Sequence, residues 1–278
     1  MIVQKIKNDR FYSFIDWVNP KYQNLNPVFV ATYNLPNVGL VTAYSKIYQL
    51  SADKRSLINE IVGYLFASAL GIPQPEYAFL AEIPTTHLRD VAVKYPQFAW
   101  LTKLNYYPAF CTSRLDGETA GIFLGDVIHT QAKVQTELNK WKALPNAVTL
   151  DENIAHTDRH LNNLIRIRHN EYATIDNGRL ICDISDDWQC TMLAPKKHYT
   201  NKLSQMACNH SPSNDQVSTM LSISEKHQNA FEQIQDELIY WAGQLIPNNT
   251  DRSHFLSFIQ DRTGLTKWLI EQRYHRLI

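Results

Sequence analysis

The chain has 278 residues and a mass of 32.1 kDa, with 27 basic and 27 acidic side chains and an isoelectric point near 7.1. A hydrophobic fraction of 44% beside 19% charged residues is typical of a globular protein and excludes a mainly disordered chain. The balanced charge excludes proteins that bind nucleic acids or anionic membranes through bulk electrostatics. No apolar run reaches the roughly 18 residues that cross a bilayer, and the polar N-terminus is unlike a signal peptide. We therefore expect a cytoplasmic protein without membrane or direct nucleic-acid partners.

The four cysteines are scattered and form no C-x-x-C pair: Cys111, Cys182, Cys190 and Cys208. A zinc site made from the last three is conceivable, but their spacings fit no common zinc template. The pattern favours reduced cytosolic thiols over a disulfide framework.

The first hundred residues favour strands around one helix. Residues 56–70 repeat apolar side chains at helical spacing, with Ser56 able to cap the start and Gly71 placed to end the helix. β-Branched and aromatic side chains predict strands at residues 29–33, 39–48, 77–83 and 90–93.

From about residue 117 the pattern becomes mostly helical. Helices are expected within residues 120–142 (broken by Pro145 just after), 148–155, 215–246 (broken once), 250–261 and 266–277, and a hairpin at 164–168 and 172–175. This order predicts an α+β fold of two lobes. Residues 1–104 would form a β-rich N-terminal lobe and residues 105–278 a mostly helical C-terminal lobe, with a cleft between them.

Three polar residues around the predicted hairpin carry the functional prediction. Asp158 and Asn163 lie five residues apart in a polar loop, and Asp176 follows the second strand. Because a hairpin brings its two ends together, Asn163 and Asp176 should lie side by side and offer the oxygen ligands that Mg²⁺ prefers. Asp158 is then a candidate base for a substrate hydroxyl. Each residue taken singly is an ordinary turn residue, but the joint spacing follows the general kinase plan.

In that plan a strand lysine contacts the phosphates of ATP and is held by a helix glutamate. Lys46 lies in an otherwise apolar strand, fourteen residues before Glu60 in the predicted helix, so we expect this pair. A solubilising edge-strand lysine is the alternative for Lys46. The string ending at Lys94 imitates the V-A-I-K strand of protein kinases, but no glutamate-bearing helix follows it. The turn at residues 33–39 has one glycine instead of G-x-G-x-x-G, which weakens it as a nucleotide loop.

The string His156-Thr-Asp-Arg-His-Leu-Asn-Asn163, followed by Ile175-Asp-Asn-Gly178, resembles the atypical kinases of the HipA-like group. It also resembles the phosphatidylinositol 3- and 4-kinases, which share the D-R-H-x-x-N loop. A helix containing Asn59-Glu60, followed by Gly71-Ile-Pro-Gln-Pro75, is similar to the HipA-like first lobe in particular. The resemblance covers roughly half of the chain, and Asn177 departs from it by replacing the aromatic residue of the D-F-G string.

The resemblance implies a protein-kinase-like fold that uses ATP and Mg²⁺. Its site residues would be Asp158 as catalytic base, Asn163 and Asp176 as metal ligands, Lys46 as phosphate contact and Glu60 as its partner. In the lipid-kinase relatives the loop histidine assists catalysis, which makes His160 a candidate. A loop-structuring hydrogen bond is the alternative for His160.

The sequence therefore predicts an ATP- and Mg²⁺-dependent phosphotransferase, with a HipA-like serine/threonine kinase acting on a protein hydroxyl as the first choice. By analogy such a kinase would be a toxin or regulator, with an antitoxin or regulatory protein as a partner. A lipid or small-molecule kinase is the first alternative, although the chain has no basic amphipathic helix. A catalytically silent pseudokinase that serves as a binding module is the second. The poor glycine loop supports this second alternative, and the intact set of Asp158, Asn163 and Asp176 argues against it.

Overall fold

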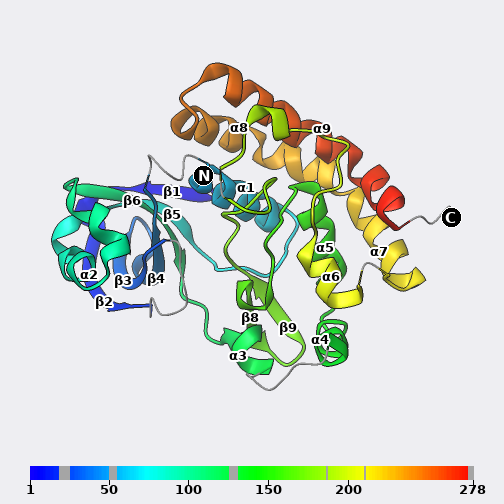
Figure 1. Cartoon of the computed structure of the whole chain (residues 1–278), viewed down its shortest axis with the longest axis horizontal. Helices are drawn as coiled ribbons and strands as arrows, with labels where there is room; N and C mark the ends of the chain where they lie inside the picture. Colours follow the sequence, from blue (N-terminus) through cyan, green and yellow to red (C-terminus); the bar gives the residue numbers. More distant parts are fainter. Residues whose placement is uncertain (19–25, 50–54, 125–130, 186, 210, 275–278) are drawn as a thin grey trace. The chain divides into compact units, whose positions relative to one another are not determined.

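The computed structural model describes residues 1–18, 26–49, 55–124, 131–185, 187–209 and 211–274 (Figure 1). The chain divides into two compact units. Residues 1–57 and 75–114 make up the first unit, and residues 58–74 and 115–278 make up the second.

The first unit is built on a six-stranded sheet in the order β1-β5-β6-β4-β3-β2. Its strands are β1 (Val3–Ile6), β2 (Phe11–Trp17), β3 (Val28–Leu35), β4 (Gly39–Ile47), β5 (Ala78–Pro84) and β6 (Tyr106–Ser113). The β1–β5 pair is parallel and the other pairs are antiparallel. A tight turn joins β3 to β4, with Asn37 and Gly39 at positive φ, a conformation that these residue types tolerate.

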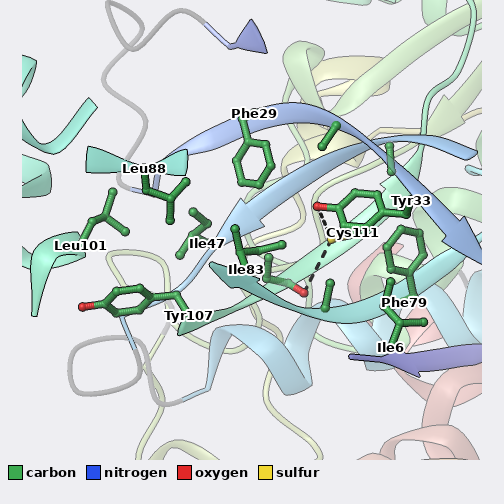
Figure 2. Close-up of a cluster of buried hydrophobic side chains, with 14 of the residues drawn as sticks. Ile6, Phe29, Tyr33, Ile47, Phe79, Ile83, Leu88, Leu101, Tyr107 and Cys111 are labelled. Atoms are coloured by element: carbon green, nitrogen blue, oxygen red, sulfur yellow. Dashed lines mark hydrogen bonds between the residues drawn. The ribbon is translucent and has the colours of Figure 1, made fainter. Parts of the chain in front are cut away.

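A cluster of buried aromatic and aliphatic side chains fills one face of this sheet (Figure 2). Its members come from the strands and from the segment around α2 (Arg89–Lys94). Three polar groups lie inside it: the hydroxyls of Tyr33 and Ser45 share a hydrogen bond of 2.6 Å, and the Cys111 thiol donates to Ser45 Oγ at 3.4 Å. Burial raises the pKa of Cys111 to about 12. The polar atoms thus satisfy one another, which lets the sheet core bury them.

The second unit combines helices with a three-stranded antiparallel sheet in the order β7-β8-β9. The strands are β7 (Glu118–Thr119), β8 (Leu164–Arg168) and β9 (Glu171–Thr174). The helices are α1 (Ser56–Ala69, whose first two residues fall in the first unit), α3 (Ala120–Leu124), α4 (Gln131–Leu138), α5 (Leu144–Asn153), α6 (Lys202–Cys208), α7 (Asn214–Ser224), α8 (His227–Leu245) and α9 (Asn249–Tyr274). Helix α9 packs along α5, α7 and α8.

The predicted α+β class, with a β-rich N-terminal part and a mostly helical C-terminal part, is confirmed. The predicted boundary at residue 104 falls before β6, which is an inner strand of the first unit's sheet. Most of α1, which the sequence assigned to the first lobe, belongs to the second unit.

Three local predictions are wrong. Residues 90–93 form helix α2, because Leu88, Val91 and Ala92 recur at helical spacing and turn one face into the buried cluster. Pro145 starts α5 instead of ending a helix, since a proline in the first turn loses no hydrogen bond. The expected break near Gly264 is absent, because an interior glycine costs only about 1 kcal/mol and α9 runs through it. Residues 275–277 of that prediction lie outside the described residues.

Helix α2 also settles the position of Lys94. The V-A-V-K string lies on this helix and not on a strand, and the Lys94 ammonium lies over the Tyr95 ring. A strand lysine at this place is therefore ruled out. In the described part of the chain, no helix has both the length and the hydrophobicity needed to cross a membrane.

A buried histidine in α8 predicts acid sensitivity. Neither ring nitrogen of His227 has a hydrogen-bond partner among the described residues, and burial lowers its pKa to about 3. The folded state therefore holds His227 neutral, while the unfolded state takes up a proton near pH 6.5. This contribution to stability is complete above pH 6.5 and is lost as the pH falls toward 3, by about 1 kcal/mol for each pH unit.

The test is urea unfolding between pH 7 and 4.5 of the wild type and of His227→Leu. We expect the leucine variant to show a flatter dependence of unfolding free energy on pH, since an apolar side chain replaces the unpaired imidazole. The exposed His254→Leu is the matched control and should follow the wild type. Parallel curves for wild type and His227→Leu would contradict the expectation.

Candidate functional site

The loop between α5 and β8 and the segment after β9 have a strained backbone. Ala155, Asp176 and Ile181 all have φ between 55° and 72°, although none is a glycine. This left-handed conformation costs roughly 1–3 kcal/mol for such residues and persists only where neighbouring contacts impose it. The Ile181 N–H donates to the Ala155 carbonyl at 2.7 Å, and Thr157 N–H donates to the Arg179 carbonyl at 3.2 Å. The two segments are thus tied together where the strain occurs.

The guanidinium of Arg159 makes the main link between the α5–β8 loop and the segment after β9. Arg159 is fully buried, and its Nε and Nη2 donate to the Asp151 carboxylate of α5 at 3.0–3.3 Å. Its Nη1 donates to the Ile175 carbonyl and its Nη2 to Asn177 Oδ1, both at 2.7 Å. A buried cation needs such a complete set of partners, because an uncompensated charge is costly to desolvate. Arg159 therefore fixes α5, the loop and the exit of the hairpin as one body.

His156 makes a second link between the same segments. Its Nδ1 accepts the backbone N–H of Asp158 at 3.2 Å, which places the ring proton on Nε2. That Nε2 donates to the Asp176 carbonyl at 3.1 Å. Burial holds the pKa of His156 well below its ordinary value, so the ring is neutral at pH 7. The backbones of Asp158 and Asp176 are therefore joined through one uncharged imidazole.

Asn163 and Asp176 come together at the open end of the hairpin. Leu164 of β8 faces Thr174 of β9, and Ile175 N–H donates to the Asn163 carbonyl at 3.1 Å. The Asn163 side chain donates from Nδ2 to the Asp158 carbonyl at 2.8 Å, which leaves its Oδ1 to act as an acceptor or ligand. The side chain of Asp176 is exposed. An amide oxygen beside a carboxylate is a donor set that fits Mg²⁺, which takes few protein oxygens and completes its shell with phosphate and water.

The Asp158 carboxylate is surrounded by cationic groups. Its side chain is 18% exposed; Lys202 Nζ contacts Oδ1, and Arg179 Nη1 lies 3.2 Å from Oδ2. His160 Nε2 lies 3.9 Å from the same Oδ2. The His160 Nδ1 accepts the Asn162 N–H at 3.2 Å, and burial lowers the pKa of His160 below its ordinary value. His160 thus makes the loop-structuring bond considered as an alternative, and its ring also lies near Asp158.

Helix α1 supports the turn after Asp176. Glu60 is 2% exposed, and its Oε2 accepts the Asn177 N–H at 2.7 Å. Asn59 donates to the Gly178 carbonyl at 2.8 Å and accepts from the Trp188 indole at 3.0 Å. The sequence singled out Glu60 as a partner for a lysine. It missed that Asn59 and Glu60 together clamp this turn, although two adjacent polar residues on an apolar helix were a signal.

Lys46 lies on β4 of the first unit, half-buried between the strand partners Val28 and Phe110. Its Nζ lies 5.5 Å from the centre of the Tyr48 ring. Glu60 belongs to the second unit, so the expected pair of Lys46 with Glu60 stays a prediction.

The structure shows all four cysteines as free thiols. No disulfide joins the four thiols. The described residues contain no cluster of three or more histidine, cysteine or acidic side chains that could hold a metal. The pair of Asn163 and Asp176 is a smaller, oxygen-only arrangement of a different kind.

No protein-family model matches the chain, and no curated protein matches its sequence. Among solved structures, the chain is similar to one described as the structure of an apo GRMZM2G135359 pseudokinase. That similarity has 10% sequence identity and a TM-score of 0.35, and it covers 99% of this chain and 90% of the other. A TM-score of this size is too low to transfer a function.

Removing the Arg159 charge should destabilise the folded protein. In Arg159→Gln the Asp151 carboxylate loses its cation while it remains buried, so we expect the free energy of unfolding to fall by about 3–5 kcal/mol. Chemical denaturation measures this loss. The control is Arg168→Gln, since Arg168 is 80% exposed and its nitrogen lies 3.9 Å from Glu171; its change should stay below about 1 kcal/mol. Equal losses in the two variants would refute the role given to Arg159.

Gly63 of α1 faces Asn177 at close range. A Cβ at position 63 would lie 2.3–2.6 Å from Asn177 side-chain atoms, so Gly63→Ala must displace the residue that accepts from Arg159. We expect a destabilisation of about 1–3 kcal/mol, measured by thermal unfolding. The control Gly243→Ala in α8 meets no atom within 4 Å and should be neutral or stabilising by up to about 1 kcal/mol. A stabilised Gly63→Ala would contradict the close packing.

Proposed function

We propose that the chain is a kinase-like phosphotransferase that binds ATP with Mg²⁺ and passes the γ-phosphoryl group to a hydroxyl. The observation that carries the proposal is that hydrogen bonds fix the segments bearing Asp158, Asn163 and Asp176 relative to one another. Arg159 and His156 join the loop that bears the first two to the turn that bears the third. Asp176 is held in a strained backbone conformation, which is often found at functional sites.

In this proposal Asn163, through Oδ1, and Asp176, through its carboxylate, hold the metal. When bound, Mg²⁺ supplies positive charge that neutralises the phosphates during transfer. The residues are suited to this work because hydrogen bonds to Asp158 and around the hairpin fix the Asn163 amide in one orientation. Helix α1 does the same for the turn that follows Asp176.

Asp158 is proposed as the base that orients the acceptor hydroxyl and receives its proton. The neighbouring cations, Lys202 and Arg179, hold the Asp158 carboxylate in place. His160 is proposed to order the loop and to assist Asp158. Lys46 is proposed as the contact to the α- and β-phosphates of ATP, with Glu60 as its partner.

The acceptor is proposed to be a serine or threonine hydroxyl of a protein, and the setting to be the cytoplasm. This finer assignment is supported by the resemblance of the loop and of the Asn59–Glu60 helix to the HipA-like kinases. A toxin or regulatory role, with an antitoxin or regulatory protein as partner, follows from the same resemblance alone.

A catalytically silent binding module is the second candidate. Both oxygens of the Asp158 carboxylate already contact cationic side chains, Lys202 and Arg179, which compete with an acceptor hydroxyl for that carboxylate. The β3–β4 turn carries one glycine, Gly39, so few backbone N–H groups can approach a phosphate there. A silent module would retain nucleotide or protein binding without turnover.

Calorimetry of ATP binding with and without Mg²⁺ tests the proposal. We expect binding that depends on Mg²⁺ in the wild type and falls at least about tenfold in Asp176→Ala, because one lost charged ligand costs more than 1.4 kcal/mol. Asp236→Ala, an exposed change in α8, is the control and should bind as the wild type does. No binding by the wild type at any Mg²⁺ concentration would refute a nucleotide-binding function.

The two candidates are separated by measuring ADP release by the wild type and by Asp158→Asn. A phosphotransferase should release ADP in the wild type and lose about 10²–10⁴-fold of that rate in Asp158→Asn while still binding ATP. Binding without ADP release, and without phosphorylation of any protein in a cell extract, supports the silent module.

A further inference from the structure

We propose that Lys202 is a further catalytic residue: it holds Asp158 in the resting protein and moves to the transferring phosphoryl group during the reaction. This inference rests on the proposed function. It concerns a residue at the start of α6, outside the loop motif, that no sequence pattern singled out.

The position of Lys202 is fixed by its neighbours in the chain. Asn201 is buried, donates to the Val148 carbonyl of α5 at 3.0 Å and caps α6 by accepting from Ser204 N–H at 3.0 Å. Leu203, on the other side, is fully buried in the helical core. The backbone at Lys202 is therefore anchored from both sides, while its side chain is 36% exposed and reaches the Asp158 carboxylate.

Proton uptake by Asp158 would weaken its contact with Lys202. A proton taken up by Asp158 removes the negative charge that attracts the two cations at its oxygens, so both contacts weaken as the reaction proceeds. Arg179 is the less exposed of the two, at 20%, and its own carbonyl is tied to Thr157 N–H. Lys202 is the more exposed cation and has a flexible four-carbon stem, so its ammonium is the one that leaves.

The reaction offers that ammonium a new partner. The acceptor oxygen forms a bond to the γ-phosphorus while the bond from that phosphorus to the β–γ bridging oxygen breaks. The electron pair leaves with ADP, and the acceptor proton passes to Asp158. As Asp158 loses its negative charge, the phosphoryl oxygens hold theirs, so an ammonium beside Asp158 is drawn from the carboxylate to the phosphoryl group. Proton uptake and phosphoryl stabilisation are thereby coupled through one side chain.

The first test is steady-state ADP release with water as the acceptor, in Lys202→Met, Lys202→Arg and the exposed control Lys133→Met. We expect kcat to fall about 100-fold in Lys202→Met with KM for ATP changed less than about twofold, because the contact forms in the transition state. Lys202→Arg keeps the charge and should recover part of the rate. An unchanged rate would mean a surface ion pair, and a faster rate would mean an inhibitory lock; either result overturns the proposal.

The second test does not depend on turnover. In Asp158→Asn the lysine loses its carboxylate partner, so its labelling by an amine-acetylating reagent, read by mass spectrometry, should rise. The Mg²⁺ complex of the β,γ-imido analogue of ATP should then reduce the labelling of Lys202 at least about threefold and leave Lys133 unchanged. The Mg²⁺ complex of ADP, which lacks the γ-phosphoryl group, should protect neither.

The two proposals fail in different ways. Nucleotide binding with full labelling of Lys202 would overturn the role of Lys202 and leave the proposed function intact. A wild type that binds no nucleotide in calorimetry would overturn both.

Discussion

The arrangement of the candidate site depends on one buried cation. The Arg159 guanidinium has no exposed surface, and its nitrogens donate to three parts of the fold: the Asp151 carboxylate, the Ile175 carbonyl just after β9 and the Asn177 side chain. Removal of a cation from water costs several kcal/mol, and only a full set of acceptors offsets that cost. The loop and the turn after β9 are therefore held close together, which imposes the positive φ of Asp176.

Helix α1 completes the same framework from the first part of the chain. Its Glu60 and Asn59 bind successive backbone groups of residues 177 and 178, more than a hundred residues away in the sequence. Gly63, one turn further along, has no side chain, so Asn177 can approach the helix and present its Oδ1 to Arg159. The segment that bears Asp176 is thus fixed on two sides, and its carboxylate remains exposed. A rigid backbone with an accessible carboxylate is what metal binding requires.

Local patterns in the sequence predicted the parts of this site that are close in the chain. The β8–β9 hairpin follows from its strand residues, and a hairpin necessarily brings residue 163 near residue 176. The contacts of Asn59 and of Lys202 could not be predicted in this way, because they join elements 119 and 44 residues apart. Helix α2 was mistaken for a strand for a related reason: its short V-A-V-K string suits either structure until the packing of Leu88 and Val91 decides.

The C-terminal helix α9 stabilises the end of α5 through Glu152, the residue beside Asp151. Asp151 and Glu152 end α5 as two adjacent buried carboxylates, where the helix dipole is unfavourable to negative charge. They turn to different partners: Asp151 to Arg159, and Glu152 to Arg273 and Arg262 of α9. Although burial lowers the pKa of Arg262 to about 10, it remains protonated at pH 7 and also donates to backbone carbonyls of Glu152 and Asn153. The end of α5 is therefore fixed by Arg159 of the loop and by the two arginines of α9. Through these contacts α9 stabilises the loop between α5 and β8, although α9 is not part of that loop.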